Sequence, residues 1–315
     1  MNIELKIFES VISFAVLVAV VFVLKERKVF NEDEGKTFSK LLVDLVLPAT
    51  IFFQLASHQI SWSQFVLILI MLISGILAMV LSYFVARIIT KERKKIGAFM
   101  ISSSFGSSAL LGYPLIKMVF PDNPNAMTDA VLISEVGVGL PLFIFCPLVA
   151  MWFGSSKEKS INLFQFVKPY FTSPIFFALI IGIIVSFLKV NFNNPFAEPV
   201  QSISEILSHG VGLISCVILG LYLKPKSFKG AVLLVIFSAI IEMGFQPYIA
   251  AFQADLFGVS EIHKKILVLI SSMPAAILGT VFAVRYDCAP DTASVLSYSH
   301  IILALISIPL INLLL

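Results

Sequence analysis

Charged residues are scarce in this 315-residue sequence. They make up 13% of it, against about a quarter of a soluble domain. Hydrophobic residues supply 58%, and the mean hydropathy is +0.99. So little charge excludes an ordinary soluble protein, and the net charge of +3 is too small and too dispersed for a nucleic-acid partner. The sequence therefore predicts an integral membrane protein whose surroundings are a lipid bilayer.

Residues and motifs typical of metal sites and enzymes are also missing. The three cysteines, Cys146, Cys216 and Cys288, are far apart and odd in number, which is typical of core thiols and not of disulfides or metal ligands. The histidines within the apolar stretches have no partner at metal-ligand spacing. No GxSG nucleophile, GxGD aspartate or HExxH motif occurs. We therefore expect no cofactor, no metal site and no enzymatic activity.

Ten apolar stretches are of spanning length for a bilayer core about 30 Å thick, and short separators with charged or turn residues divide them. We expect an all-α membrane fold with ten transmembrane helices. The stretches are residues 7–25, 38–57, 64–88, 96–120, 128–153, 170–189, 200–223, 229–252, 264–285 and 292–314.

Basic residues indicate the orientation of these spans. Most of the 22 lysines and arginines follow spans 1, 3, 5, 7 and 9, for example in the run from Lys91 to Lys95. Because cytoplasmic loops are enriched in Lys and Arg, both termini are expected outside the cytoplasm. A plasma or bacterial inner membrane is the expected location.

The fourth span is poorly suited to a continuous helix. Its segment Ile101 to Pro114, ISSSFGSSALLGYP, holds five serines, two glycines and a proline. Proline and glycine disfavour helix interiors, so this helix should break near its centre. Freed backbone groups cannot face lipid, and breaks of this kind line polar cavities in transporters.

A faint internal repeat places a second break in the ninth span. Ile101-Ser102-Ser103 recurs as Ile270-Ser271-Ser272, followed by Met273-Pro274. Both lie in the fourth helix of a five-helix half, and an odd number of spans inverts the second half relative to the first. We expect one transporter domain of two inverted repeats, residues 1–157 and 158–315.

Three segments carry a resemblance to a known family: GYPLIKMVFP (Gly112 to Pro121), Leu47-Pro48-Ala49, and SSMPAAILGTVFAVRYDCAP (Ser271 to Pro290). Together with the ten spans they resemble the auxin efflux carrier family over the whole chain. The resemblance implies that spans 4 and 9 cross as an X and that spans 1, 2, 6 and 7 form a scaffold. The other six would form a moving core.

The same resemblance implies a small organic anion as partner, such as auxin, malate or malonate, and a homodimer through the scaffold helices. The family is similar in fold to sodium-coupled bile acid transporters. Many members have an asparagine seven residues before the first crossover proline and a glycine two residues later, where this chain has Ser107 and Ala109. Serine offers a single hydroxyl in place of an amide, so the family's substrates do not transfer directly. The ninth-span break has no carboxylate of its own, which weakens the case for sodium coupling.

If the two breaks cross, the N-termini of two helical segments would point toward the same position. Because helix N-termini carry partial positive charge, a carboxylate could bind there. The alternative is that these small residues only permit close helix packing. The expected substrate-binding residues are Ser104, Gly106, Ser107, Ser108, Gly112, Pro114, Ser271, Ser272, Met273 and Pro274.

Ionisable side chains within membrane spans carry a large desolvation cost, so each is expected to have a functional or structural role. Glu135, Glu242 and His300 could carry a coupling ion or proton, or each could bond a neighbouring helix. Asp44 is expected to be structural. Lys117 could reach an anion or direct its ammonium group to the membrane interface.

These observations favour a secondary active transporter that moves a small organic anion by alternating access, with proton coupling through one of the in-span carboxylates. Two alternatives stay open: a passive channel or uniporter, because polar breaks also line pores, and a non-transporting sensor on the same fold. The substrate, the direction of transport and the coupling ion do not follow from the residues.

Overall fold

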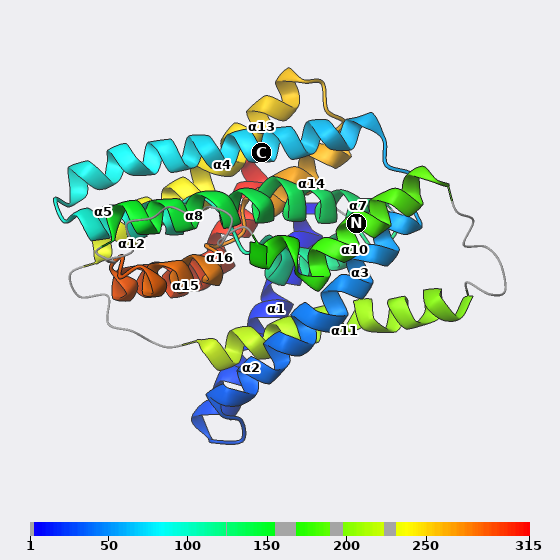
Figure 1. The fold of residues 1–315 in the computed structure, drawn as a ribbon, viewed down its shortest axis with the longest axis horizontal. Coiled ribbons are helices and arrows are strands. Elements are labelled where there is room, and N and C mark those ends of the chain that lie inside the picture. The colour runs from blue at the N-terminus through cyan, green and yellow to red at the C-terminus, as the bar shows by residue number, and fades with distance from the viewer. Residues whose placement is uncertain (1–2, 124, 155–167, 190–197, 224–230) are drawn as a thin grey trace. The chain divides into compact units, whose positions relative to one another are not determined.

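The computed structural model describes residues 3–123, 125–154, 168–189, 198–223 and 231–315, and every regular element in these ranges is a helix. Within them, seven helices are long and apolar enough to cross a membrane, which confirms an integral membrane protein with several spans. They are α1 (Ile3–Glu26), α2 with η1 and α3 (Glu32–Leu41, Leu42–Val46, Leu47–Ala56), α4 (Trp62–Ile89), α7 with η3 and α8 (Ala126–Leu132, Ile133–Gly139, Leu140–Phe153), α11 (Glu198–Tyr222), α12 with η4 and α13 (Val232–Ile240, Ile241–Phe245, Gln246–Leu256) and α16 (Pro290–Leu314) (Figure 1).

The other three expected spans are not single long helices. The fourth is α5 (Arg93–Ser102) followed by η2 (Ser108–Gly112) and α6 (Tyr113–Val119), and the ninth is α14 (Glu261–Ser271) followed by α15 (Ile277–Arg285). The sixth is α10 (Pro174–Phe187), of 14 residues, or about 21 Å at 1.5 Å per residue. It begins later than expected because the hydroxyl of Ser173 caps it and Pro174 occupies its first position.

Three acidic residues in the middle of expected spans lie in π-helical segments. In the described residues, each of η1, η2, η3 and η4 is followed, two residues after its end, by a proline. Proline lacks an N–H and displaces the carbonyl of the preceding turn, and a locally widened helix relieves that conflict. Asp44, Glu135 and Glu242 lie in η1, η3 and η4. Because π-helical segments often mark functional sites, these three carboxylates are candidate functional groups.

The described chain forms two compact units, and each draws on both halves of the sequence. Unit 1 contains Met1–Gln64, Ala109–Val131 and Lys168–Leu223. Its helix α11 packs against α1, α2, α3 and α6, and α10 packs against α3. Unit 1 thus holds spans 1, 2, 6 and 7, which the family resemblance assigns to the scaffold, and also α6 from span 4.

Unit 2 contains Phe65–Ser108, Leu132–Val167 and Lys224–Leu315. Here α5 packs against α8, α15 and α16, and α16 also packs against α12, α14 and η4. The broken ends of α5 and α14 both belong to this unit. The inverted repeat of residues 1–157 and 158–315 stays a prediction, because the compact units do not follow the sequence halves.

Close packing of α10 on α3 yields a stability prediction. A Cβ at Gly182 would lie 2.9 Å from Leu55 Cβ and 3.2 Å from Phe52 O. Neither atom can move without shifting α3, so Gly182→Ala should lower the free energy of unfolding by about 1–3 kcal/mol. Thermal unfolding in detergent measures this. The control is Gly210→Ala on α11, where the nearest atom to the new Cβ is 3.7 Å away. An equal melting temperature for the two variants would contradict the packing argument.

Candidate functional site

The backbones of the two broken helices are hydrogen-bonded to each other. After α5 ends at Ser102 the chain is not helical until Ser108, and after α14 ends at Ser271 it is not helical until Ile277. Gly106 and Ala275 form an antiparallel bridge. The bonds are Ser107 N–H to Pro274 O at 2.7 Å and Ala276 N–H to Phe105 O at 3.0 Å. Each break thereby satisfies backbone groups that the other leaves free, which is the condition for non-helical backbone at membrane depth.

Serines at the two breaks cap the ends of α5 and α14. Their hydroxyls donate to carbonyl oxygens in the last turn of their own helix, where carbonyl groups lack N–H partners from a following turn. All four side chains are buried. The bonds are Ser103 to Phe99 O (2.7 Å), Ser104 to Met100 O (2.5 Å), Ser271 to Val268 O (3.0 Å) and Ser272 to Leu269 O (2.8 Å).

Gly106 permits the closest approach at the crossing. A Cβ on this residue would lie 2.7 Å from Met273 O and 3.3 Å from Glu242 Oε1. The position therefore requires glycine, because the nearer atom belongs to the backbone of the other break. The same distances show that the carboxylate of Glu242, from η4, lies beside the bridge.

Glu242 is fully buried, and neither of its carboxylate oxygens has a hydrogen-bond partner among the residues that the structure describes. Gln246, at the start of α13, is also fully buried with both amide atoms unpartnered, as are both ring nitrogens of His300 on α16. Unpaired buried polar groups are destabilising by about 1–3 kcal/mol each and are expected to have a function. In the described part of unit 2, unpartnered polar groups thus lie on η4, α13 and α16, and the hydroxyl of Ser102 on α5 is another.

Two features of this site differ from the sequence-based picture. The ninth-span break has no carboxylate of its own, but Glu242 of the eighth span supplies one. Gln246 was not among the expected site residues. Its position four residues after Glu242, on the same side of the helix and directly before Pro247, was the available signal.

Four further residues expected at the site, Ser107, Ser108, Met273 and Pro274, lie in unit 2. Ser107 is half-buried, and the hydroxyls of Ser108 and Ser134 lie 2.7 Å apart, which ties the start of η2 to η3. Glu135, also in η3, is buried and has an interaction partner. Met273 and Pro274 are buried in the ninth-span break. Their neighbours in the structure therefore include both the bridge and the Glu242 carboxylate.

Gly112 and Pro114 belong to unit 1, apart from the other expected binding residues. Gly112 is the N-cap residue of α6, and Pro114 lies in the first turn of that helix. The break itself lies earlier, at residues 103–107. Pro114 therefore follows the break and does not interrupt the helix in which it lies.

Comparison with known proteins shows the family of the chain. The profile of the family described as "Membrane transport protein" matches residues 6–312. An uncharacterized transporter of Methanocaldococcus jannaschii is 26% identical over 287 residues, covering 89% of each chain. An uncharacterized transporter of Methanothermobacter thermautotrophicus is 24% identical over 96% of each chain. The uncharacterized transporter YfdV of Escherichia coli is 18% identical over 271 residues, 85% of this chain and 84% of its own. Because the family match extends over nearly the whole chain, the protein belongs to the auxin efflux carrier family of membrane transporters.

Proposed function

We propose that the protein is a secondary active transporter that carries small organic anions by alternating access, with ten spans in two inverted repeats of five. The observation that carries this proposal is the pair of helix breaks bonded to each other through Gly106 and Ala275, with Glu242 beside them. Non-helical backbone at membrane depth is tolerated where it is buried in protein or lines a cavity, and transporters form their substrate sites from broken helices of this kind. Membership of a transporter family supports the same conclusion.

The expected substrate is a carboxylate. Two helical segments begin at the breaks, η2 at Ser108 and α15 at Ile277. The first N–H groups of such segments carry partial positive charge and attract anions. Because the serines at positions 103, 104, 271 and 272 already cap α5 and α14, backbone N–H groups and the half-buried Ser107 are the donors that we assign to the substrate.

The position of Glu242 supports proton coupling as part of the proposal. An ionised Glu242 beside the bridge would repel a substrate carboxylate bound there. At a separation of about 4 Å the repulsion is about 4 kcal/mol for an effective dielectric constant of 20, or roughly a thousandfold in affinity. A proton on Glu242 removes this repulsion, so substrate and proton would bind together. We therefore propose that Glu242 is the coupling group, in preference to Glu135 and His300.

Uptake into proteoliposomes tests the function. Labelled malate, malonate, succinate and indole-3-acetate are offered separately, with and without an inward proton gradient. We expect saturable uptake of at least one anion, and we expect the gradient to raise its initial rate several-fold. Empty liposomes and heat-inactivated protein are the controls.

Three other results of the uptake assay would contradict part of the proposed function. Saturable uptake that ignores the gradient would contradict proton coupling and indicate a uniporter. Uptake that stays proportional to concentration and follows the membrane potential would indicate a channel. If folded protein moves none of the four acids, the anion assignment itself is wrong.

A further inference from the structure

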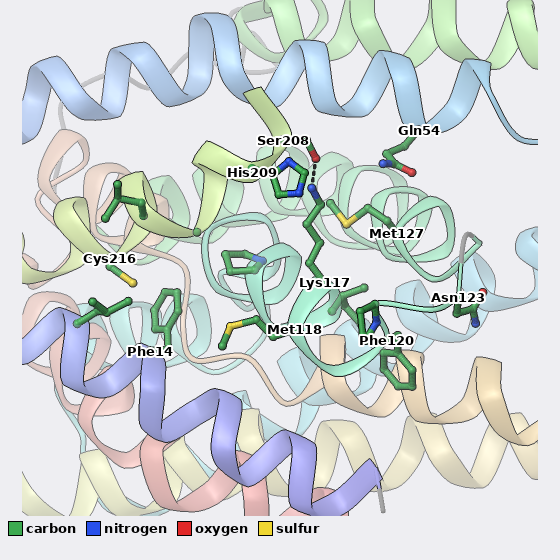
Figure 2. A pocket seen from close by; sticks show the side chains of 16 residues that line it. Phe14, Gln54, Lys117, Met118, Phe120, Asn123, Met127, Ser208, His209 and Cys216 are labelled. Carbon is green, nitrogen blue, oxygen red and sulfur yellow. Dashed lines mark hydrogen bonds between the residues drawn. The ribbon is translucent and has the colours of Figure 1, made fainter. Parts of the chain in front are cut away.

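A pocket in unit 1 has the size and the lining of a small-molecule site. Its volume is about 570 Å³, within the range of about 300–1,000 Å³ that is usual for ligand pockets. Helices α1, α3, α6 and α11 contribute to it, together with the segment that follows α6 (Figure 2). The pocket shares only Pro114 with the binding residues expected from the sequence. Apolar lining residues include Phe14, Leu17, Ile116, Phe120, Met127 and Leu213.

Lys117 supplies a positive charge at this pocket. It is half-buried, and its ammonium group donates a hydrogen bond to the hydroxyl of Ser208, a buried residue of α11. Figure 2 shows the side chain extending from α6 toward Ser208 and His209. Lys117 is the one lysine among the described residues that line the pocket, which include no arginine, aspartate or glutamate; Glu205, which interacts with it electrostatically, is not part of the lining.

The direction of the Lys117 side chain separates two explanations for a lysine in a span. A lysine that only reaches the membrane interface extends its ammonium group into water. Here the ammonium group instead meets a buried hydroxyl at the wall of an apolar pocket. A charged side chain within a membrane span has a high desolvation free energy, and such residues usually mark binding sites or substrate paths. The surroundings of Lys117 therefore favour ligand binding.

Polar groups near Lys117 complete a recognition site for an anionic head. The Nδ1 of His209 donates to Glu205 O at 2.7 Å, because a carbonyl oxygen can only accept. This bond fixes the orientation of the imidazole, which lines the pocket beside Ser208. Gln54 adds a side-chain amide from α3. A ligand carboxylate can thus accept from the ammonium group while its body contacts the apolar wall.

We propose that this pocket binds amphipathic monocarboxylic acids, with Lys117 holding the carboxylate and the apolar wall holding the hydrocarbon or aromatic body. The proposal concerns residues of unit 1 only. It does not require the coupling role of Glu242, and it holds whether or not the bound acid is the one transported. Because a hydrogen bond to a charged group is stronger than one between neutral groups, loss of the bond between Lys117 and the carboxylate should weaken binding at least about tenfold.

Equilibrium dialysis of the purified protein in lipid nanodiscs tests the site with labelled 4-phenylbutyrate. Its neutral isostere 4-phenylbutyramide is the matched ligand. We expect Lys117→Met to weaken binding of the acid at least tenfold, Lys117→Arg to keep it within about threefold of wild type, and wild type to bind the amide at least tenfold more weakly than the acid. Lys6→Met, a lysine of α1 outside the pocket, should bind like wild type.

A second variant fills the pocket without changing its charge. Gly212 lines the pocket, and a Cβ there would be 3.7 Å from Pro114 Cβ, an ordinary contact. Gly212→Leu should place the rest of its side chain in the pocket and weaken binding at least tenfold, and thermal unfolding checks that the variant is folded, so it tests the site even if Lys117→Met is unstable. Competition with oleate distinguishes a fatty acid from the membrane from a water-borne acid, and displacement by either supports the carboxylate site.

The proposal would be overturned if the wild-type protein bound neither probe, or if it bound the amide as tightly as the acid. Undiminished binding by folded Lys117→Met or by folded Gly212→Leu would also overturn it. Because dialysis measures binding and not flux, such a failure is distinguishable from failure of the proposed transport function.

Discussion

Glu242→Gln is expected to abolish stimulation of uptake by a proton gradient. Glutamine has the shape of a protonated glutamate but cannot ionise, so the site would accept the anion without taking up a proton. Gradient-driven accumulation should fall at least tenfold. Exchange of labelled for unlabelled substrate at equal pH should continue, because exchange needs no net movement of protons. Paired uptake and counterflow assays in the same proteoliposomes measure both quantities.

The matched control for this variant is Asp44→Asn, in η1 of unit 1. Asp44 is also a carboxylate within an expected span, but it is exposed, whereas Glu242 is fully buried. Uptake by Asp44→Asn should respond to the gradient as wild type does. If Glu242→Gln still concentrates substrate in response to the gradient, Glu242 is not the coupling group. Glu135 and His300 would then be the next residues to neutralise.

Gly106→Ala is expected to disrupt the crossing of the two breaks. The added Cβ would lie 2.7 Å from Met273 O, closer than real Cβ contacts, and the bridge to Ala275 leaves neither backbone free to withdraw. Either the bridge separates or α5 and α14 shift. We expect a loss of about 1–3 kcal/mol in stability and at least a tenfold fall in uptake. Thermal unfolding and initial uptake rates measure the two effects.

Gly244→Ala is the control for this prediction because it is in the same unit and has no atom within 4 Å of the added Cβ. It should keep wild-type stability and uptake. Should Gly106→Ala transport at the wild-type rate, close approach of the two breaks would not be needed for function, and the crossing would be only a packing feature.

Much of the fold could be predicted from the sequence because hydropathy and helix-breaking residues act locally. Each long helix of the described chain falls within or around an expected apolar stretch. The segment Ile101 to Pro114 is interrupted at residues 103–107, which include serines and Gly106, and the segment Ile270 to Gly279 is interrupted at residues 272–276, which include Pro274. The sixth span was predicted too long, because hydropathy does not register a Ser-Pro helix start such as Ser173-Pro174.

The site was less predictable because its geometry depends on residues far apart in the chain. Glu242 was singled out as a charge within a span, but its position beside Gly106 rests on the packing of α5, α14 and α16 with the eighth span. Ser104, Ser271 and Ser272 were expected to bind the substrate, and this stays a prediction. The structure adds that these three residues, with Ser103, cap the ends of α5 and α14, a use that the Ser-rich pattern alone does not distinguish.

The sequence by itself determined the class of this protein, the apolar stretches that hold its long helices and the two helix breaks, because burial in lipid selects apolar runs and because clustered small residues and proline disfavour helix interiors. Tertiary structure alone decided that Gly106 meets Ala275, that Glu242 and Gln246 are buried without partners, and that Lys117 meets Ser208 across an apolar pocket. These contacts join residues separated by roughly 90 or more positions or depend on how whole helices pack. No local pattern of residues encodes them.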